Sequence, residues 1–251
     1  DRLGHRPGGG TGCGGGAETR GRERMSENIR VAIDGPSGAG KSTLARSVAA
    51  RLNFLYVDTG AIYRTIGYAV WRKGIDPRDR SAVVAVLPDL EICLTYGTDG
   101  LQHMELNGMD VTAEIRLPEV SRYASLVSAY PEVRAYLLEM QRQLARENSV
   151  VMDGRDIGTC VLPDAPAKIY LTASVEIRAR RRFRELEEKG TACDIREIEK
   201  DIEERDYRDM HRENSPLRQA EDAVLLDSSH MTIEQVVDSI IRIARERGYE
   251  G

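Results

Sequence analysis

This 251-residue sequence lacks the features of a membrane protein, of a disulfide-stabilised protein and of a zinc protein. No apolar run approaches the ~20 residues that a membrane-spanning helix requires. The four cysteines are scattered without a Cys-x-x-Cys pair, which indicates reduced thiols rather than a disulfide framework or a zinc site. The four histidines are dispersed as well, so no histidine metal cluster is expected. These absences predict a cytoplasmic protein that does not bind a membrane.

An excess of basic residues is also missing, because the net charge is −5 at pH 7. A general nucleic-acid-binding protein carries the opposite balance, so we expect no nucleic-acid partner. Any cations that hold phosphate groups must then be gathered locally. The length and the 41% hydrophobic content suit one globular α/β unit with inserted subdomains.

The first 24 residues lack the apolar side chains that a folded segment needs. Glycine dominates positions 8–16, and four of the five residues at positions 20–24 are charged, so the segment cannot bury enough surface to offset its ordering entropy. It contains no apolar core of a secretory signal. Because Met25 lies just before the first apolar run, we expect residues 1–24 to be a disordered extension, or the product of a misassigned start. A regulatory or targeting tail is the alternative. Residues 25–251 are expected to form the folded domain.

From residue 29 onward, short apolar runs alternate with helical patterns, which is typical of a parallel sheet flanked by helices. The expected strands are Ile29–Ile33, Phe54–Val57, Val150–Met152, Ile169–Leu171 and Val224–Leu226. The last helix begins with a capping-box pattern at Thr232 and Gln235. An antiparallel insert is predicted between the second and third of these strands. It consists of Glu91–Tyr96 and Leu101–Leu106 and continues through an Asn-Gly turn. We expect this insert to lie near a second substrate.

One glycine-rich segment follows the first expected strand and matches the phosphate-loop pattern G-x-x-x-x-G-K-[ST]. It consists of Gly35, Pro36, Ser37, Gly38, Ala39, Gly40, Lys41, Ser42 and Thr43. Glycines allow backbone N–H groups to turn toward phosphate oxygens, and a helix N-terminus adds partial positive charge. We expect Lys41 to reach the β- and γ-phosphates and Ser42 to bind Mg²⁺. The alternative is a turn that binds nothing, but such turns seldom carry a Lys-Ser pair after a strand.

Two polar clusters follow the expected strands, at the edge where open α/β sheets bind ligands. The first runs from Asp58 to Arg64, and its arginine is suited to grip a phosphate; an ordinary helix cap with a surface arginine is the alternative. The second is Asp153–Asp156. Here Asp153 suits Mg²⁺ and Arg155 suits a transferring phosphoryl group, whereas the alternative is a tight surface turn.

Two arginine-rich segments come later in the chain. One of them places four residues on one helix face: Arg205, Arg208, Asp209 and Arg212. Such a face favours a bound anion, and a solvated, ion-paired face is the alternative. The second has five arginines between residues 178 and 184. It suits nucleic-acid binding, a lid that closes over a nucleoside triphosphate, or a helix with Arg181–Glu185 and Arg184–Glu188 pairs. The acidic surroundings favour a lid whose outer face is salt-bridged.

Taken together, these segments resemble the bacterial-type cytidylate kinase family. The matching stretches, in the order of the family, are Ile33–Thr43, Asp58–Arg64, Asp110–Arg116, Ala124–Arg134, Asp153–Thr159, Pro163–Pro166 and Glu204–Arg212. The resemblance covers residues 29–248. It implies a P-loop NTPase-type parallel five-stranded sheet flanked by helices, with a monophosphate-binding subdomain at about 59–147 that carries the antiparallel insert, and a mobile lid at about 180–212. The implied reaction transfers the γ-phosphoryl group of ATP to CMP or dCMP, and the chain is expected to be a monomer.

The resemblance also implies a role for each matching residue. The catalytic residues would be Lys41, Asp153, Arg155 and Arg212, with Ser42 and Asp153 at the Mg²⁺ that accompanies ATP. The CMP-binding residues would be Thr59, Tyr63, Arg64, Ser125, Arg134, Arg155, Asp156, Arg205, Asp209 and Arg212. Within that set Ser125, Arg134 and Asp156 would bind the base. Arg205 and Asp209 would hold the sugar, while Arg64, Arg155 and Arg212 would hold the acceptor phosphate.

The base assignment agrees with the chemistry of cytosine, whose amino group donates while N3 and O2 accept. Asp156 can accept from the amino group and Arg134 can donate to the acceptors. Uracil would present a carbonyl oxygen to that carboxylate and leave buried polar groups unpaired. A kinase for another acceptor (UMP, AMP, shikimate or a nucleoside) would not need this pair and remains one alternative. A nucleotide-dependent regulatory or nucleic-acid-binding protein is the other.

Overall fold

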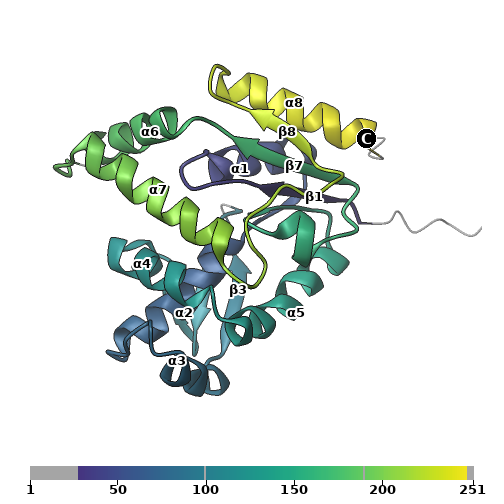
Figure 1. Ribbon diagram of the computed structural model, residues 1–251. Coiled ribbons are helices and arrows are strands. Elements are labelled where there is room, and N and C mark those ends of the chain that lie inside the picture. The colour runs from purple at the N-terminus through teal and green to yellow at the C-terminus, as the bar shows by residue number, and fades with distance from the viewer. Residues whose placement is uncertain (1–27, 99, 189, 248–251) are drawn as a thin grey trace, which may run out of the picture.

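The computed structural model describes residues 28–98, 100–188 and 190–247, and a parallel sheet lies at its centre (Figure 1). The strands are β1 (Arg30–Asp34), β2 (Leu55–Asp58), β6 (Val150–Gly154), β7 (Ala167–Thr172) and β8 (Val224–Asp227). They pair in the order β2-β6-β1-β7-β8, and every pairing is parallel. The expected five-stranded parallel sheet is therefore confirmed. The expectation for residues 1–24 lies outside the described residues.

Both faces of this sheet are covered, as the central strand β1 illustrates. Val31, Ala32 and Ile33 are fully buried. Successive side chains of a strand point to opposite faces, so Ala32 joins one hydrophobic cluster while Val31 and Ile33 join the other. Burial of a side chain such as Val31 or Ile33 stabilises the fold by about 1.5–3 kcal/mol. The covering helices are α1 (Lys41–Leu52), α2 (Thr59–Arg72), α5 (Pro131–Glu147) and α8 (Ile233–Glu246), the last with its expected capping box.

The expected antiparallel insert is a second sheet with the order β3-β4-β5. Its strands are β3 (Ile92–Tyr96), β4 (Gln102–Leu106) and β5 (Met109–Asp110). Asn107 and Gly108 both have positive φ in the turn before β5, as an Asn-Gly hairpin requires. The side chain of Gln102 accepts from the N–H of Asp58 at 2.7 Å and donates to its carbonyl at 3.2 Å. These bonds fix the insert beside the end of β2.

Helix α2 packs closely on α4 (Pro118–Val127), below the parallel sheet in Figure 1. The contact depends on Gly67, because a Cβ there would lie 2.7 Å from the backbone nitrogen of Ala124. Short elements complete this region: α3 (Arg80–Val86), η1 (Leu87–Asp89) and η2 (Glu114–Arg116). None of the helices in the described ranges is long and apolar enough to cross a lipid bilayer.

A pair of helices, α6 (Val175–Glu188) and α7 (Ile195–His211), projects from the sheet, and α7 runs back toward α4 (Figure 1). The pair has a small core of its own, made of Ala179, Ile198 and Ile202. Its outer face carries ion pairs, as expected. Their partners differ from the Arg181–Glu185 and Arg184–Glu188 pairs that the i, i+4 spacing suggested. In the described chain Glu176 pairs with Arg180 and Arg182 pairs with Glu185, while Arg181 turns inward to the carbonyl of Ser228.

Candidate active site

The phosphate loop joins β1 to α1 and is shaped for the close approach of a ligand. Gly38 and Gly40 have φ of 73° and 84°, which glycine adopts at little cost. Gly40 precedes α1, and no side chain of the described ranges caps this helix end, so its first N–H groups remain available to an anion. Lys41 is only 6% exposed and donates to the carbonyl of Pro36 at 2.7 Å. Burial and then the positive charge of Arg155 lower the pKa of Lys41, and an anion beside it would oppose both effects.

The two expected metal ligands meet at the carboxyl end of the sheet. Ser42 Oγ donates to Asp153 Oδ2 at 2.9 Å, and the hydroxyl of Tyr56 donates to the other carboxylate oxygen at 2.9 Å. Asp153 is 4% exposed. Burial, and then the charge of Asp58, raises the pKa of Asp153 to about 6. Tyr56 carries no functional signal in the sequence, because it lies in the middle of an apolar strand.

At the end of β2, Asp58 performs two tasks. It caps α2 by accepting from the N–H of Ala61 at 2.9 Å, and it pairs with Arg64 at 2.8 Å. The helix-cap alternative is therefore correct for Asp58, but Arg64 is not a surface residue, since its side chain is 21% exposed. Thr59 Oγ1 donates to the carbonyl of Asp153 at 2.7 Å, which ties the start of α2 to β6.

The segment after β6 is held from the central strand. Asp34, at the end of β1, accepts from the N–H groups of Ile157 and Gly158 at 2.8 and 2.7 Å. These residues open the single π-helical turn η3 (Ile157–Val161), a type of turn that occurs often at functional sites. Asp34 therefore fixes the backbone that presents Arg155 and the next residue, Asp156. Its only signal in the sequence is an acidic residue at the end of a buried strand.

The three expected base-binding residues come from three parts of the chain: Arg134 from α5, Ser125 from α4 and Asp156 from the start of η3. Arg134 of α5 forms a buried ion pair with Asp156, and its guanidinium lies 5.3 Å from the centre of the Tyr63 ring. Arg212 approaches the other carboxylate oxygen of Asp156 at 3.8 Å. Ser125 belongs to α4. Burial raises the pKa of Tyr63 to about 12, so its hydroxyl stays neutral and able to donate.

Helix α7 brings most of its expected face to the same place. Arg205 is partly buried, and Asp209 accepts from Arg155 Nε at 2.8 Å. The exception is Arg208, which is exposed and takes no part in the cluster, so the four-residue stripe is wrong at this position. Burial, and then the neighbouring charge of Arg155, lowers the pKa of Arg205 to about 10. Burial and then Arg134 lower the pKa of Arg212. Burial is the larger cause for both arginines, and repulsion by a neighbouring arginine adds to it.

Several polar atoms of this cluster lack a partner. Six buried side-chain nitrogen or oxygen atoms have no hydrogen-bond partner within the described chain, and four of them belong to expected CMP-binding residues. The four are Arg64 Nε, Ser125 Oγ, Arg205 Nε and Arg212 Nη2. An unsatisfied buried polar atom costs about 1–3 kcal/mol, so the occurrence of four of them in expected CMP-binding residues indicates a site for a polar ligand.

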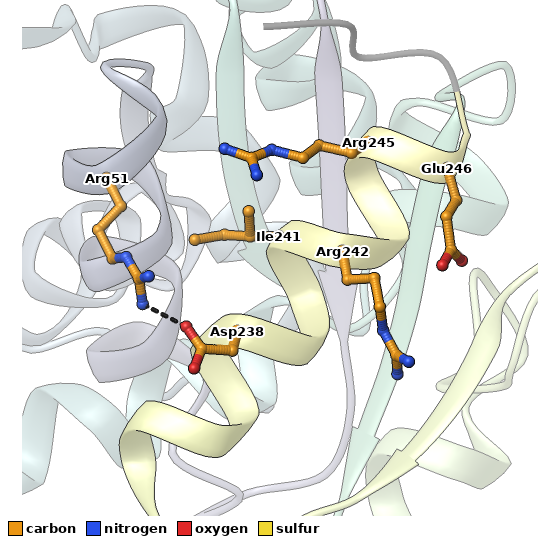
Figure 2. Close-up of a pocket in the computed structure, with 6 residues that line it drawn as sticks. All are labelled: Arg51, Asp238, Ile241, Arg242, Arg245 and Glu246. Atoms are coloured by element: carbon orange, nitrogen blue, oxygen red, sulfur yellow. Dashed lines mark hydrogen bonds and ion pairs between the residues drawn. The ribbon is translucent and has the colours of Figure 1, made fainter.

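Two surface cavities differ in their relation to this cluster. A cavity of about 350 Å³ between α1 and α8 is lined by Arg51, Asp238, Ile241, Arg242, Arg245 and Glu246 (Figure 2). Its main polar contact is the ion pair of Arg51 with Asp238 at 2.6 Å, and it contains none of the expected site residues. A second cavity of about 450 Å³ has Arg212 and Tyr130 in its lining and therefore opens beside the arginine cluster.

Comparison with known proteins shows the family of this chain. The family model described as cytidylate kinase matches residues 31–246. A cytidylate kinase of Caldicellulosiruptor bescii is 48% identical over 86% of this chain and 96% of its own length. Those of Desulfitobacterium hafniense and Desulforamulus reducens are 48% and 51% identical, over 89% and 86% of this chain and 95% and 97% of their own lengths. The chain belongs to the cytidylate kinase family.

Proposed function

We propose that this protein transfers the γ-phosphoryl group of ATP to CMP or dCMP, giving CDP or dCDP and ADP. The observation that carries the proposal is the set of four buried polar atoms, on Arg64, Ser125, Arg205 and Arg212, that have no hydrogen-bond partner in the described chain. A phosphate loop alone suits many reactions. A second site beside it, rich in arginine and carrying a paired carboxylate, is suited to a nucleoside monophosphate.

The donor triphosphate would lie on Gly35–Thr43, with Lys41 at the transferring group. Mg²⁺ would be held by Ser42 and Asp153, whose oxygens are the ligands that this ion prefers. The described residues contain no group of three or more metal-binding side chains, which suits an ion that arrives with the triphosphate. Bound there, the ion would neutralise charge on the phosphate oxygens.

The base would lie against Arg134, Asp156 and Ser125. Asp156 can accept from the cytosine amino group, while Arg134 keeps a second anchor through its bond to the carbonyl of Ser128 at 3.1 Å. Ser125 Oγ has no partner in the described part of the chain and is free to bond the ligand. The Arg134–Asp156 pair therefore holds the carboxylate in place for the cytosine amino group. UMP carries a carbonyl oxygen at that position and could not donate a hydrogen bond to the carboxylate.

The sugar and the acceptor phosphate would lie between α2, β6 and α7. We assign Arg205 and Asp209 to the sugar. Arg64, Arg155 and Arg212 would hold the phosphate, with Thr59 and Tyr63 lining the same space. The planar forks of the arginines suit phosphate oxygens. In this assignment the monophosphate-binding subdomain spans about 59–147 and the lid about 180–212.

The chemistry would be a direct in-line displacement. An oxygen of the acceptor phosphate is already anionic at pH 7, so the reaction needs no strong base. That oxygen bonds to the γ-phosphorus as the bond to the β-γ bridging oxygen breaks, and ADP leaves with the electron pair. Lys41, Arg155 and Arg212 would align the groups and stabilise the spreading charge. Exclusion of water by the lid would prevent hydrolysis.

An ADP-release assay with ATP·Mg²⁺ and a panel of acceptors tests this function. We expect rapid turnover with CMP and dCMP, little with UMP or AMP, and only slow hydrolysis without an acceptor. Turnover with UMP or AMP in place of CMP would contradict the base-binding assignment. Absence of acceptor-dependent turnover would contradict the function itself.

A further inference from the structure

One residue of the phosphate loop, Ser37, is held on both sides by the helix pair α6–α7. Its N–H donates to Asp206 Oδ1 at 3.0 Å, and its carbonyl accepts from Arg178 Nη1 at 2.7 Å. Arg178 and Asp206 pair with each other at 2.6 Å. These three residues therefore form a closed ring of hydrogen bonds, the Ser37 ring, that joins α6, α7 and the loop.

The Ser37 ring is buried and rigid. Arg178 is 4% exposed and Asp206 is 7% exposed. Arg178 has a further anchor, because its Nε donates to the carbonyl of Ala173 at 2.9 Å. Charge-assisted bonds away from water are strong and directional, but a buried ion pair as a whole adds little net stability over apolar residues of the same volume. The ring therefore contributes mainly a fixed geometry between the helices and the loop.

That geometry reaches the proposed acceptor site through α7. Asp206 is next to Arg205 and one turn from Asp209, the two residues assigned to the sugar. The core of α6–α7 forms a hydrophobic cluster separate from the two clusters of the parallel sheet. The helix pair is thus a packed unit of its own, and the Ser37 ring sets where it lies on the phosphate loop.

We propose that Arg178 and Asp206 are positioning residues that couple the two nucleotide sites. By fixing α7 on the phosphate loop, the Ser37 ring makes binding of the triphosphate at the loop strengthen binding of the monophosphate at α7, and the reverse. Neither residue needs to touch a substrate. The inference rests on the proposed function, because it requires a monophosphate site that includes Arg205 and Asp209.

The test compares Asp206→Asn with a matched control, Glu176→Gln. An asparagine can still accept from Ser37, but its NH₂ group would face Arg178, which only donates, so the ring would break. Glu176→Gln makes the same carboxylate-to-amide change at the exposed pair with Arg180 on the same helix pair. For each protein, calorimetry measures the dissociation constant of CMP with and without a non-hydrolysable ATP analogue and Mg²⁺.

We expect the analogue to tighten CMP binding by at least about fivefold in the wild type and in Glu176→Gln, the lower end of typical coupling. In Asp206→Asn the factor should fall to near one. Linkage also requires CMP to change the affinity for the analogue by the same factor in every protein. A merely structural role would lower the melting temperature and both affinities without changing this factor.

A folded Asp206→Asn with the wild-type factor would overturn the inference, and so would a wild type that shows no coupling. If Asp206→Asn does not fold, Arg178→Lys takes its place, because lysine keeps the charge but its single nitrogen cannot replace both Nε, which bonds Ala173, and Nη1, which bonds Ser37 and Asp206. The outcome is again decided by the factor by which the analogue tightens CMP binding. A wild type that binds the analogue but no CMP would overturn the proposed function as well, which separates the two failures.

Discussion

Arg155 Nε donates to Asp209 Oδ2 at 2.8 Å, which links the end of β6 to α7 across 54 residues of chain. Both side chains are largely buried. Burial opposes ionisation of Asp209, but Arg155 and Arg205 together outweigh it and lower the pKa of this carboxyl. Removing one partner of such a pair costs about 3–5 kcal/mol, so variants at either residue test stability and catalysis together.

Lys41→Ala should lower kcat by about 10²-fold or more, because the loop loses the cation that stabilises the transferring charge. The affinity for CMP should stay close to the wild-type value, since the base and sugar residues lie on other elements. Steady-state kinetics and calorimetric CMP binding measure the two effects. Lys73→Ala, at an exposed lysine after α2, is the control and should change neither. Normal turnover of Lys41→Ala would reject the phosphate-loop assignment.

Asp156→Asn should erode the preference for CMP over UMP. The change removes the carboxylate that accepts from the cytosine amino group, and the amide can instead donate to the uracil carbonyl. We expect the ratio of the two kcat/KM values to fall on the order of tenfold or more. Asp164→Asn, at an exposed carboxylate paired with Arg30, is the matched control. An unchanged ratio in folded Asp156→Asn contradicts the base-binding role.

Asp34→Asn tests how the segment after β6 is held. Asparagine offers one acceptor oxygen, so the N–H of Ile157 or of Gly158 loses its partner. An unsatisfied buried group costs about 1–3 kcal/mol, and we expect the KM for CMP to rise on the order of tenfold with a smaller change in the KM for ATP. Equal changes in both KM values would mean that Asp34 supports the fold only generally.

The raised pKa of Asp34 predicts that the free energy of unfolding depends on pH. Burial raises the pKa of Asp34 from 3.8 to about 6, so in the folded protein this group keeps a proton that the unfolded chain has released. Its contribution to the free energy of unfolding therefore decreases as the pH rises from about 4 to about 6. The stability advantage of the wild type over Asp34→Asn should shrink by up to about 3 kcal/mol across this range. Urea unfolding of both proteins at several pH values measures it, and a constant difference contradicts the prediction.

Gly67→Ala should destabilise the protein without altering the site chemistry. The new Cβ would lie 2.7 Å from the nitrogen and 3.0 Å from the Cα of Ala124, so α4 must move away from α2. Such overpacking costs about 1–3 kcal/mol. Thermal unfolding should show a lower melting temperature. An unchanged melting temperature would show that α4 can shift freely.

Local patterns predicted the parallel sheet because each strand is a short apolar run that ends in a turn or a polar residue. Val31–Ile33 is fully buried, and burial on both faces is what such a run indicates. The Asn-Gly turn before β5 was likewise predictable, since few other residue pairs accept two positive φ angles. Spacing failed at Arg208 and Arg181. A helical face defines which residues are neighbours but not which of them another element covers.

The phosphate loop, the strand order along the chain and the residue types of both nucleotide sites could be predicted from the sequence, because these depend on local backbone freedom and side-chain chemistry. Which polar groups bond one another became clear from the folded structure alone. Asp34 meets the backbone of η3 across 123 residues, and Asp206 meets Ser37 across 169. No local rule specifies such contacts, because they arise from the packing of distant elements. That packing leaves Ser125 and Arg205 with unpartnered atoms in the described chain and so marks the place for a ligand.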